Sequence, residues 1–249
     1  MITSRSGPPR AATGLFWAIG IGLAWLLSLV GLLFVGSDDL AVPSIVVAIL
    51  GRTLLQTGLF IVGHDAMHGS LLPMAPRLND RIGTLALQVY ACLPWERCRS
   101  NHHSHHLAPG TLADPDFHGL QAAHPLAWYE RFMVGYLARG QMGWLLVSWS
   151  AIALFCSLHS PTAWRDVLLF CTLPLLLSSL QLFLFGTYLP HRAGAGTANP
   201  HHASSLAMPV WLSFVACFHF GYHWEHHEHP EQPWFRLPAQ RRLDTADQR

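Results

Sequence analysis

Long apolar stretches alternate with polar, histidine-rich segments along the chain. Four of these stretches, over residues 14–36, 43–63, 142–158 and 166–189, approach the length of about 20 residues that a helix needs to cross a bilayer core. Two shorter apolar segments, 83–93 and 206–220, fall below that length and predict re-entrant or interfacial elements. The pattern therefore predicts an all-α integral membrane protein with four transmembrane helices.

The composition favours the same fold class and indicates one domain over residues 1–249. Hydrophobic residues make up 51% of the chain and charged residues only 12%, against about 25% in ordinary soluble domains. The mean hydropathy is +0.28. A net charge of +1 gives no case for a nucleic-acid partner. We expect flexible tails at residues 1–13 and 239–249.

The arginines predict the orientation in the membrane. If the N-terminus is cytoplasmic, every arginine outside the spans except Arg165 lies on the cytoplasmic side. The same topology places all histidine-rich segments on that side, so we expect a cytoplasmic histidine-rich cap. Arg52 lies inside the second predicted span, where a charge is costly. It belongs either to a packed structural interaction or to a path for substrate.

Histidine is unusually frequent, with 17 residues, and eight of these occur in three regularly spaced blocks. The spacings are H-x-x-x-H, H-x-x-H-H and H-x-x-H-H, and the residues are His64, His68, His102, His105, His106, His223, His226 and His227. Residues three and four apart share one face of a helix, so each block can direct two or three imidazoles at one point. Eight nitrogen ligands are too many for one metal ion and fit two.

The number of histidines also bears on the metal. Imidazole binds zinc, copper, iron and nickel. A structural zinc takes four ligands and a catalytic zinc three plus water, so the excess favours two iron ions with positions left for dioxygen. His191 ends the fourth predicted span at the same depth as the blocks. It is a candidate ninth ligand, acting either directly or through another ligand.

Three carboxylates lie next to the first two blocks. Asp65 is inside the first block, and Asp114 and Asp116 follow the second. Metal-bound histidines usually donate their second N–H to a carboxylate or a carbonyl, which makes these three the candidate catalytic acids. Each could instead be a solvated carboxylate or one that caps a turn.

The order of the three blocks on a four-span frame resembles the membrane fatty acid desaturase and hydroxylase superfamily. Longer segments are similar to the bacterial β-carotene ketolases, namely residues 60–70, 109–118, 182–192, 217–230 and 233–238. The resemblance covers about residues 15–238. The chain departs from many of these proteins at Ala108, where they carry a further histidine.

This resemblance implies a non-haem diiron oxygenase of the bacterial cytoplasmic membrane. It would convert an allylic ring methylene of β-carotene into a ketone, with two iron ions as cofactor and dioxygen as co-substrate. The carotenoid would arrive from the lipid bilayer. The sequence shows no haem, flavin, nicotinamide or iron–sulfur motif, so the reductant must be external. We expect a ferredoxin-like donor, docking near the arginine-rich segment 77–99.

Two other classes of function are compatible with the histidine blocks. A carotenoid ring hydroxylase or a membrane fatty acid desaturase would use the same iron site on a different C–H bond. A metal transporter or metal-binding scaffold would also need many histidines. Transporter ligands lie near the bilayer midplane, however, whereas these histidines lie at the ends of the predicted spans.

Overall fold

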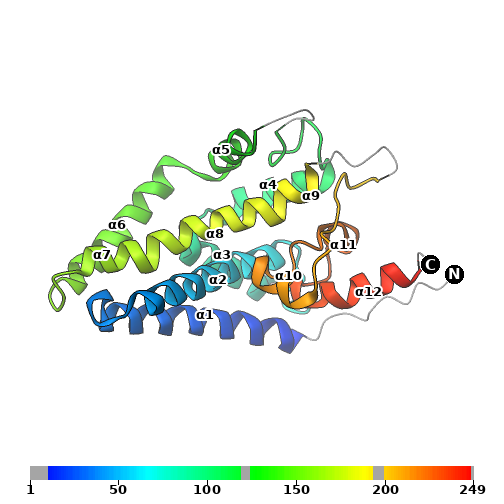
Figure 1. Cartoon of the computed structure of the whole chain (residues 1–249). Coiled ribbons are helices and arrows are strands. Elements are labelled where there is room, and N and C mark those ends of the chain that lie inside the picture. The colour runs from blue at the N-terminus through cyan, green and yellow to red at the C-terminus, as the bar shows by residue number, and fades with distance from the viewer. Residues whose placement is uncertain (1–10, 119–123, 193–198, 248–249) are drawn as a thin grey trace.

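The structure, a computed structural model, describes residues 11–118, 124–192 and 199–247, which fold mainly as helices (Figure 1). The longer helices are α1 (Ala11–Val35), α2 (Val42–Met67), α3 (Pro76–Ala91), α4 (Trp95–Leu107), α5 (Pro125–Tyr136), α6 (Arg139–Cys156), α8 (Leu173–Phe183) and α12 (Leu237–Asp247). The shorter ones are α7 (Ala163–Val167), α9 (Leu189–His191), α10 (Val210–Cys217) and α11 (His223–Glu228). Two 3-10 turns, η1 (Ser37–Asp39) and η4 (Trp234–Arg236), and two π-helical turns, η2 (Leu168–Thr172) and η3 (Leu184–Tyr188), complete the described chain.

Three helical segments of the described chain are long and apolar enough to cross a membrane: Ala12–Val35, Val42–Met67 and Ala163–His191. They match three of the four predicted spans, and the last is a continuous run from α7 to α9. The remaining prediction, 142–158, falls in α6, which has 18 residues. Arg139 and Gln141 occupy its first turn, so its apolar part is shorter than that of the other three. The short apolar segments lie on α3 and α10.

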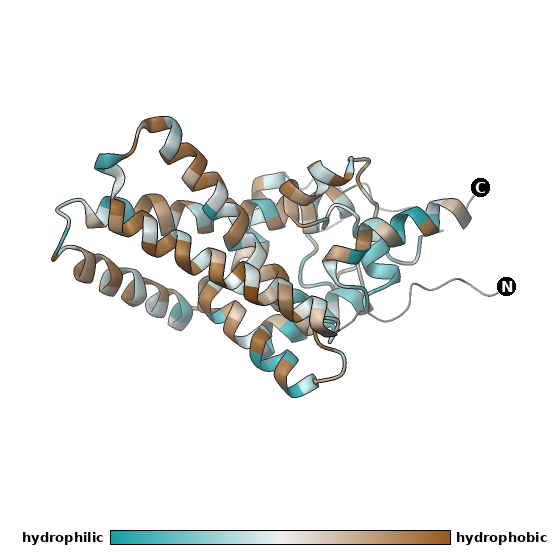
Figure 2. Cartoon of the chain, turned by 90° about the horizontal axis from the view of Figure 1, so that it is seen from below, coloured by the Kyte–Doolittle hydropathy of each residue, from teal (hydrophilic) through white to brown (hydrophobic). Residues whose placement is uncertain are grey.

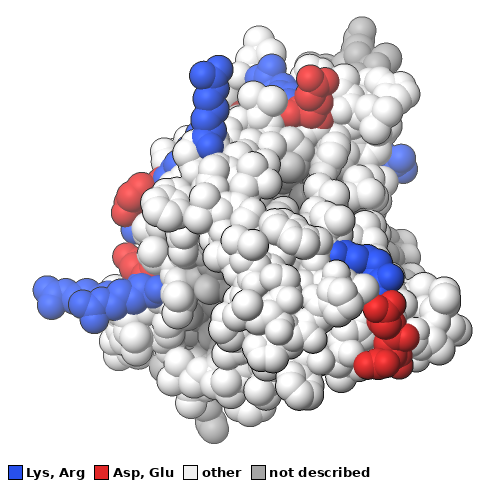
Figure 3. Space-filling view, turned by 90° about the vertical axis from the view of Figure 1, so that its left-hand side faces the viewer, with Lys and Arg blue, Asp and Glu red and all other residues white. Residues whose placement is uncertain are grey.

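The histidine-bearing ends of the elements lie together at one end of the elongated bundle. The C-terminal ends of α2 and α9 lie near α4 and α11 at that end (Figure 1). Hydrophilic residues are concentrated around α11 and α12, and hydrophobic residues along the rest of the bundle (Figure 2). The opposite end, where α1 meets α2 and α6 meets α7, shows few charged side chains (Figure 3). The polar chemistry is therefore gathered at one end.

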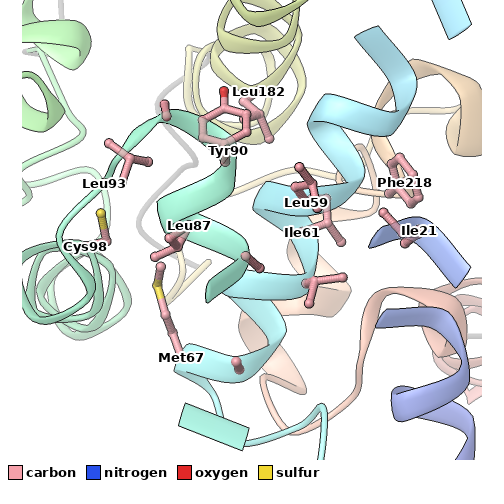
Figure 4. Packing of buried hydrophobic residues seen from close by; sticks show 14 of the residues in the cluster. Ile21, Leu59, Ile61, Met67, Leu87, Tyr90, Leu93, Cys98, Leu182 and Phe218 are labelled. Carbon is pink, nitrogen blue, oxygen red and sulfur yellow. The ribbon is translucent and has the colours of Figure 1, made fainter. Parts of the chain in front are cut away.

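A buried hydrophobic cluster joins α1, α2, α3, α8 and α10 (Figure 4). Ile21, Leu59 and Phe218 meet in it, although they come from separate parts of the chain. Glycine permits a close contact between α2 and α3, because a Cβ at Gly63 would lie 2.7 Å from the side chain of Leu87. Such a distance forces a shift in a close-packed interior. This tight contact holds α3 against the half of α2 that ends in the first histidine block.

Arg52 is buried in α2 and bonds to neutral groups. Its Nε donates to the carbonyl of Phe170 at 3.1 Å, and its Nη1 donates to the carbonyl of Trp25 and to Ser28 Oγ. The guanidinium carbon also lies 4.8 Å from the centre of the Trp25 ring. Phe170 belongs to the π-helical turn η2, where the altered hydrogen bonding leaves carbonyls free to accept. Arg52 thus has the structural role, joining α1, α2 and η2.

The C-terminal segment differs from the prediction. Residues 239–247, expected to be flexible, continue α12. Arg241 donates to Glu225 at 2.8 Å, and His229 lies 3.3 Å from Asp244, so α12 is attached to the third histidine block and to His229, two residues beyond it. Of the expected flexible ends, residues 1–10 and 248–249 lie outside the described chain, and α1 already begins at Ala11.

Candidate metal centre

The nine candidate histidines are carried by the ends of helices. The first block closes α2, with His64 in its last turn and His68 directly after it. The second block occupies the C-terminal half of α4, and the third forms most of α11. His191 is the last residue of α9. Each block is therefore helical, as the spacing predicts, and all four elements meet at the polar end of the bundle.

The structure divides the nine histidines into two groups. One contains His64, His68, His102, His106 and His226, and the other contains His105, His191, His223 and His227. Within each group the candidate ligand nitrogens all lie within 4.8 Å of one another. The expectation that each block points to a single centre is wrong for the second and third blocks, because each contributes to both groups.

Helix geometry explains this division. Side chains four residues apart on an α-helix point in directions that differ by about 40°. Side chains three residues apart differ by about 60°, in the opposite sense of rotation. His102 and His106 therefore share a group, as do His223 and His227. His105, three residues after His102, points to the other centre.

The Nε2 atoms of the four-histidine group converge. His227 Nε2 lies 3.1 Å from His105 Nε2 and 3.0 Å from His223 Nε2. His191 Nε2 lies 3.0 Å from the same His223 Nε2 atom. All four side chains are buried. His191 thus belongs to this group by position, 32 residues before His223.

The second ring nitrogens show where the protons are. His191 Nδ1 donates to the carbonyl of His202 at 2.8 Å, and His105 Nδ1 donates to the carboxylate of Asp114 at 2.9 Å. A carbonyl and a carboxylate only accept hydrogen bonds. In the neutral imidazoles the proton is therefore on Nδ1, and the Nε2 lone pairs face the centre of the group.

The five-histidine group shows the same convergence. His68 Nε2 lies 2.7 Å from His102 Nε2, and His106 Nε2 lies 3.0 Å from His226 Nε2. The ring of His64 lies between them, 4.4 Å from that of His102. Its Nε2 is buried and has no hydrogen-bond partner among the described residues. Buried polar atoms are rarely left unpaired, so this nitrogen marks a place for a ligand.

Both groups fit a metal ion. Lone pairs that face one another repel unless a proton or a metal cation lies between them. Imidazole nitrogens bound to one ion at about 2.1 Å stand roughly 3 Å apart, which matches the separations in both groups. The donor set is nitrogen only, and imidazole suits iron among the first-row metals. The residues present are therefore compatible with one ion in each group.

The electrostatics keep most of these imidazoles in the form that binds metal. Burial lowers the pKa of His102, His226 and His227 well below the ordinary value, and the neighbouring histidines lower it further. Neutral imidazole is the ligand form. His105 differs: burial opposes its protonation, but the hydrogen bond to Asp114 raises its pKa above the ordinary value.

Of the three predicted carboxylates, Asp114 orients a histidine directly. Burial alone would raise its pKa, but the hydrogen bond with His105 and those from the Gly110 and Asp116 amides bring it below the ordinary value. It is therefore an ionised acceptor, buried beside His105 Nδ1. Asp65 instead accepts from the backbone amide of Trp234 at 3.1 Å, and its contact with His64 Nδ1 is longer, at 3.4 Å.

The surroundings of Asp116 differ from those of Asp114 and Asp65. It accepts a hydrogen bond from the Tyr136 hydroxyl at 3.2 Å, and burial raises its pKa to about 6. Sequence reasoning missed Tyr136, which lies 20 residues from its partner on another helix. It also missed His202, because the group that holds His191 is a backbone carbonyl, and a side-chain pattern gives no signal for that.

A hydrophobic cavity leads to the histidines. It has a volume of about 270 Å³ and lies between α2, α3, α5, α6 and α8. A smaller pocket of about 40 Å³ borders His64, His102, His105 and His223. Four residues line both spaces: Phe60, Phe132, Tyr136 and Leu182. The small pocket therefore lies between this apolar cavity and both histidine groups.

Comparison with known proteins agrees with this architecture. A model of the fatty acid desaturase family matches residues 40–248. The chain belongs to the fatty acid desaturase family. A β-carotene ketolase from Paracoccus sp. is 43% identical over 244 residues, which cover 94% of this chain and 95% of that protein. A zeaxanthin 4-ketolase from Chlamydomonas reinhardtii is 37% identical over 225 residues, 88% of this chain and 49% of that protein. The resemblance to the β-carotene ketolases is thereby confirmed.

Proposed function

We propose that this protein is a β-carotene ketolase, which oxidises the allylic methylene of a β-ionone ring to a ketone. The observation that carries the proposal is the apolar cavity, which shares four lining residues with the small pocket that borders on both histidine groups. Identity of 43% over 94% of the chain to a Paracoccus β-carotene ketolase supports it. A hydrocarbon substrate dissolved in the bilayer needs such a path, because its ring must reach the metal while its polyene remains among apolar side chains.

The cofactor that we propose is a pair of iron ions, one in the five-histidine group and one in the four-histidine group. Bound iron would supply the activation of dioxygen that an unreactive C–H bond requires. Two hydroxylations at one carbon form a gem-diol, and loss of water from it leaves the ketone. Each hydroxylation places one oxygen atom on carbon and reduces the other to water with protons and electrons from outside the substrate.

The residues around the histidines orient them and hold protons. Asp114 keeps the proton of His105 on Nδ1, and the His202 carbonyl does so for His191, so both rings present Nε2 to their group. Tyr136 and Asp116 share a proton at the wall of the small pocket. Phe60 and Leu182 form the apolar part of that wall and keep water from the ring.

For the membrane, we propose four crossings with the histidines on the cytoplasmic side. The three long helical segments cannot by themselves return the chain from α5, near the histidines, to α7 at the opposite end. α6 makes this connection, and its 18 residues rise by about 27 Å, close to the roughly 30 Å of a hydrocarbon core. The arginine distribution supports the orientation, in a bacterial cytoplasmic membrane.

For the reductant, we propose an external ferredoxin-like protein. A recess of about 360 Å³ borders His68 of the five-histidine group and is lined also by Arg99 and His103. Exposed Arg77 and Arg81 lie on the neighbouring helix α3. Positive charge there would favour an acidic partner and make turnover depend on ionic strength. If raising the salt concentration leaves the apparent affinity for the donor unchanged, this docking site is wrong.

Expression in a host that makes β-carotene tests the proposed activity. Pigment chromatography should show canthaxanthin or its one-keto precursor echinenone, and metal analysis of the purified protein should find about two iron ions per chain. A ring-hydroxylated product alone would indicate a hydroxylase. Unchanged β-carotene together with altered lipid double bonds would indicate a desaturase. Either result would overturn the ketolase assignment, and a single zinc ion would overturn the diiron centre.

A further inference from the structure

Thr187 carries a hydroxyl that no other described residue engages. The residue is 5% exposed and lies in the π-helical turn η3. Threonines in helices commonly donate to the carbonyl four residues earlier, as Thr53 does to Ile49 at 2.8 Å. Thr187 makes no such bond within the described chain. The hydroxyl is not among the fully enclosed unpaired atoms of the described residues, so it has access to open space, and a molecule in that space can be its partner.

The hydroxyl belongs to the wall of the small pocket beside the histidines. Thr187 lines this pocket together with His105, Asp116 and Tyr136. Asp116 and Tyr136 are hydrogen-bonded to each other. Among the described residues around the pocket that are not histidines, Thr187 therefore offers the hydroxyl that remains available to a ligand.

The pocket wall beside this hydroxyl is closely packed. Gly186 precedes Thr187 in η3 and lines the same pocket. A Cβ at Gly186 would lie 3.1 Å from Phe220 Cδ2, so the absence of a side chain lets the Phe220 ring pack directly against η3. That ring packs against His64 at 4.5 Å and cannot move freely. Single π-helical turns inside α-helices often occur at functional sites, and here the turn brings two consecutive residues to one wall.

We propose that the Thr187 hydroxyl forms a hydrogen bond with an oxygen on the ring in this pocket and thereby sets the specificity for oxygenated rings. This inference rests on the proposed function. Two hydroxyl groups on the ring can supply this oxygen, and they have the same hydrogen-bonding chemistry. It is either the hydroxyl introduced by the first hydroxylation or a hydroxyl that the ring already carries, as in zeaxanthin. A threonine hydroxyl donates and accepts, so it complements both.

Thr187→Val tests the proposal because it removes the hydroxyl and keeps the shape of the side chain. The variant is compared with the wild type in hosts that produce β-carotene or zeaxanthin. If the first hydroxylation supplies the oxygen, 4-hydroxylated carotenoid accumulates from β-carotene. If the ring carries it on arrival, conversion of zeaxanthin falls and conversion of β-carotene is retained. The expected change is roughly 3- to 10-fold, as for the loss of one neutral hydrogen bond.

Two control variants separate recognition from folding. Thr187→Ser keeps the hydroxyl and should restore the wild-type product ratio. Thr53→Val removes a buried hydroxyl that bonds its own helix outside the pocket and should leave that ratio unchanged. Unchanged ratios in Thr187→Val, or an equal loss on both substrates without accumulation of a 4-hydroxylated intermediate, would overturn the proposal.

A binding measurement distinguishes failure of this inference from failure of the proposed function. The purified proteins are loaded with a mixture of β-carotene, its 4-hydroxylated form and zeaxanthin, and the retained pigments are extracted and compared. Thr187→Val should retain less of one hydroxylated pigment relative to β-carotene. An equal ratio overturns the hydrogen bond whether or not turnover occurs. Absence of ketone from the wild type overturns the ketolase activity alone.

Discussion

The Nε2 atoms of His191 and His223 lie 3.0 Å apart, although the residues are separated by 32 positions in the chain. His191 Nδ1 donates to the His202 carbonyl, so the proton of this ring faces away from His223. Two nitrogens this close repel unless a proton of His223 or a metal cation lies between them. The pair is therefore compatible with His191 as a ligand in the proposed metal centre.

His191→Ala should remove one ion and the ketone product. The variant leaves three histidines in its group, and we expect the iron content to fall from about two to about one per chain, with activity reduced at least 100-fold. Metal analysis and pigment chromatography measure both. His159→Ala, at an exposed site outside both groups, serves as the control. Full iron content with partial activity would mean that His191 acts through another ligand.

Asp114→Ala should weaken metal binding without removing a ligand. The carboxylate accepts the Nδ1 proton of His105 at 2.9 Å, and loss of such a partner typically lowers metal affinity by about 10- to 100-fold. Iron retention is measured against increasing chelator, with Asp38→Ala at the opposite end of the bundle as the control. Identical retention curves for Asp114→Ala and wild type would contradict the role of Asp114.

Gly186→Ala should reduce the size of the reaction pocket. The new Cβ would lie 3.1 Å from Phe220 Cδ2, so the ring must shift by a few tenths of an ångström toward His64 and His226. We expect ketone formation to fall several-fold, on the order of 1 kcal/mol of lost transition-state stabilisation. In the control, Gly143→Ala, the new Cβ meets no atom within 4 Å. Equal activity of the two variants would contradict the narrow pocket.

The pH dependence of stability should report on Asp116. Burial raises its pKa to about 6, above the ordinary value of 3.8, so the folded protein holds this proton more tightly than the unfolded chain. By linkage, the contribution of Asp116 to the free energy of unfolding is fully present below about pH 4 and is lost as the pH rises through 6. The free energy of unfolding falls by about 2–3 kcal/mol through this group.

Asp116→Asn removes that titration while it keeps an oxygen for Tyr136. Thermal unfolding of the metal-free protein in detergent, followed between pH 5 and 8, should therefore decline less steeply for the variant. The variant should also be the more stable protein at pH 8. Parallel curves for the two proteins would show that Asp116 ionises as readily in the folded as in the unfolded state.

Local pattern was sufficient for the features that depend on one helix at a time. The lengths of the apolar stretches located three spanning segments, and the spacing of the blocks placed their histidines on helices. It failed where a neighbour decides the outcome. The contact of Arg241 with Glu225 orders a helix in a segment whose composition predicts a flexible tail.

The sequence by itself determined that this is a helical membrane protein with histidine clusters near the span ends, because apolar length and helical periodicity are local properties. Only the tertiary structure decided how the histidines are divided. His105 and His106 are consecutive, yet His105 Nε2 meets His227 and His106 Nε2 meets His226. Adjacent side chains on a helix diverge by about 100°, so the packing of α4 against α2, α9 and α11 determines which centre each ring reaches.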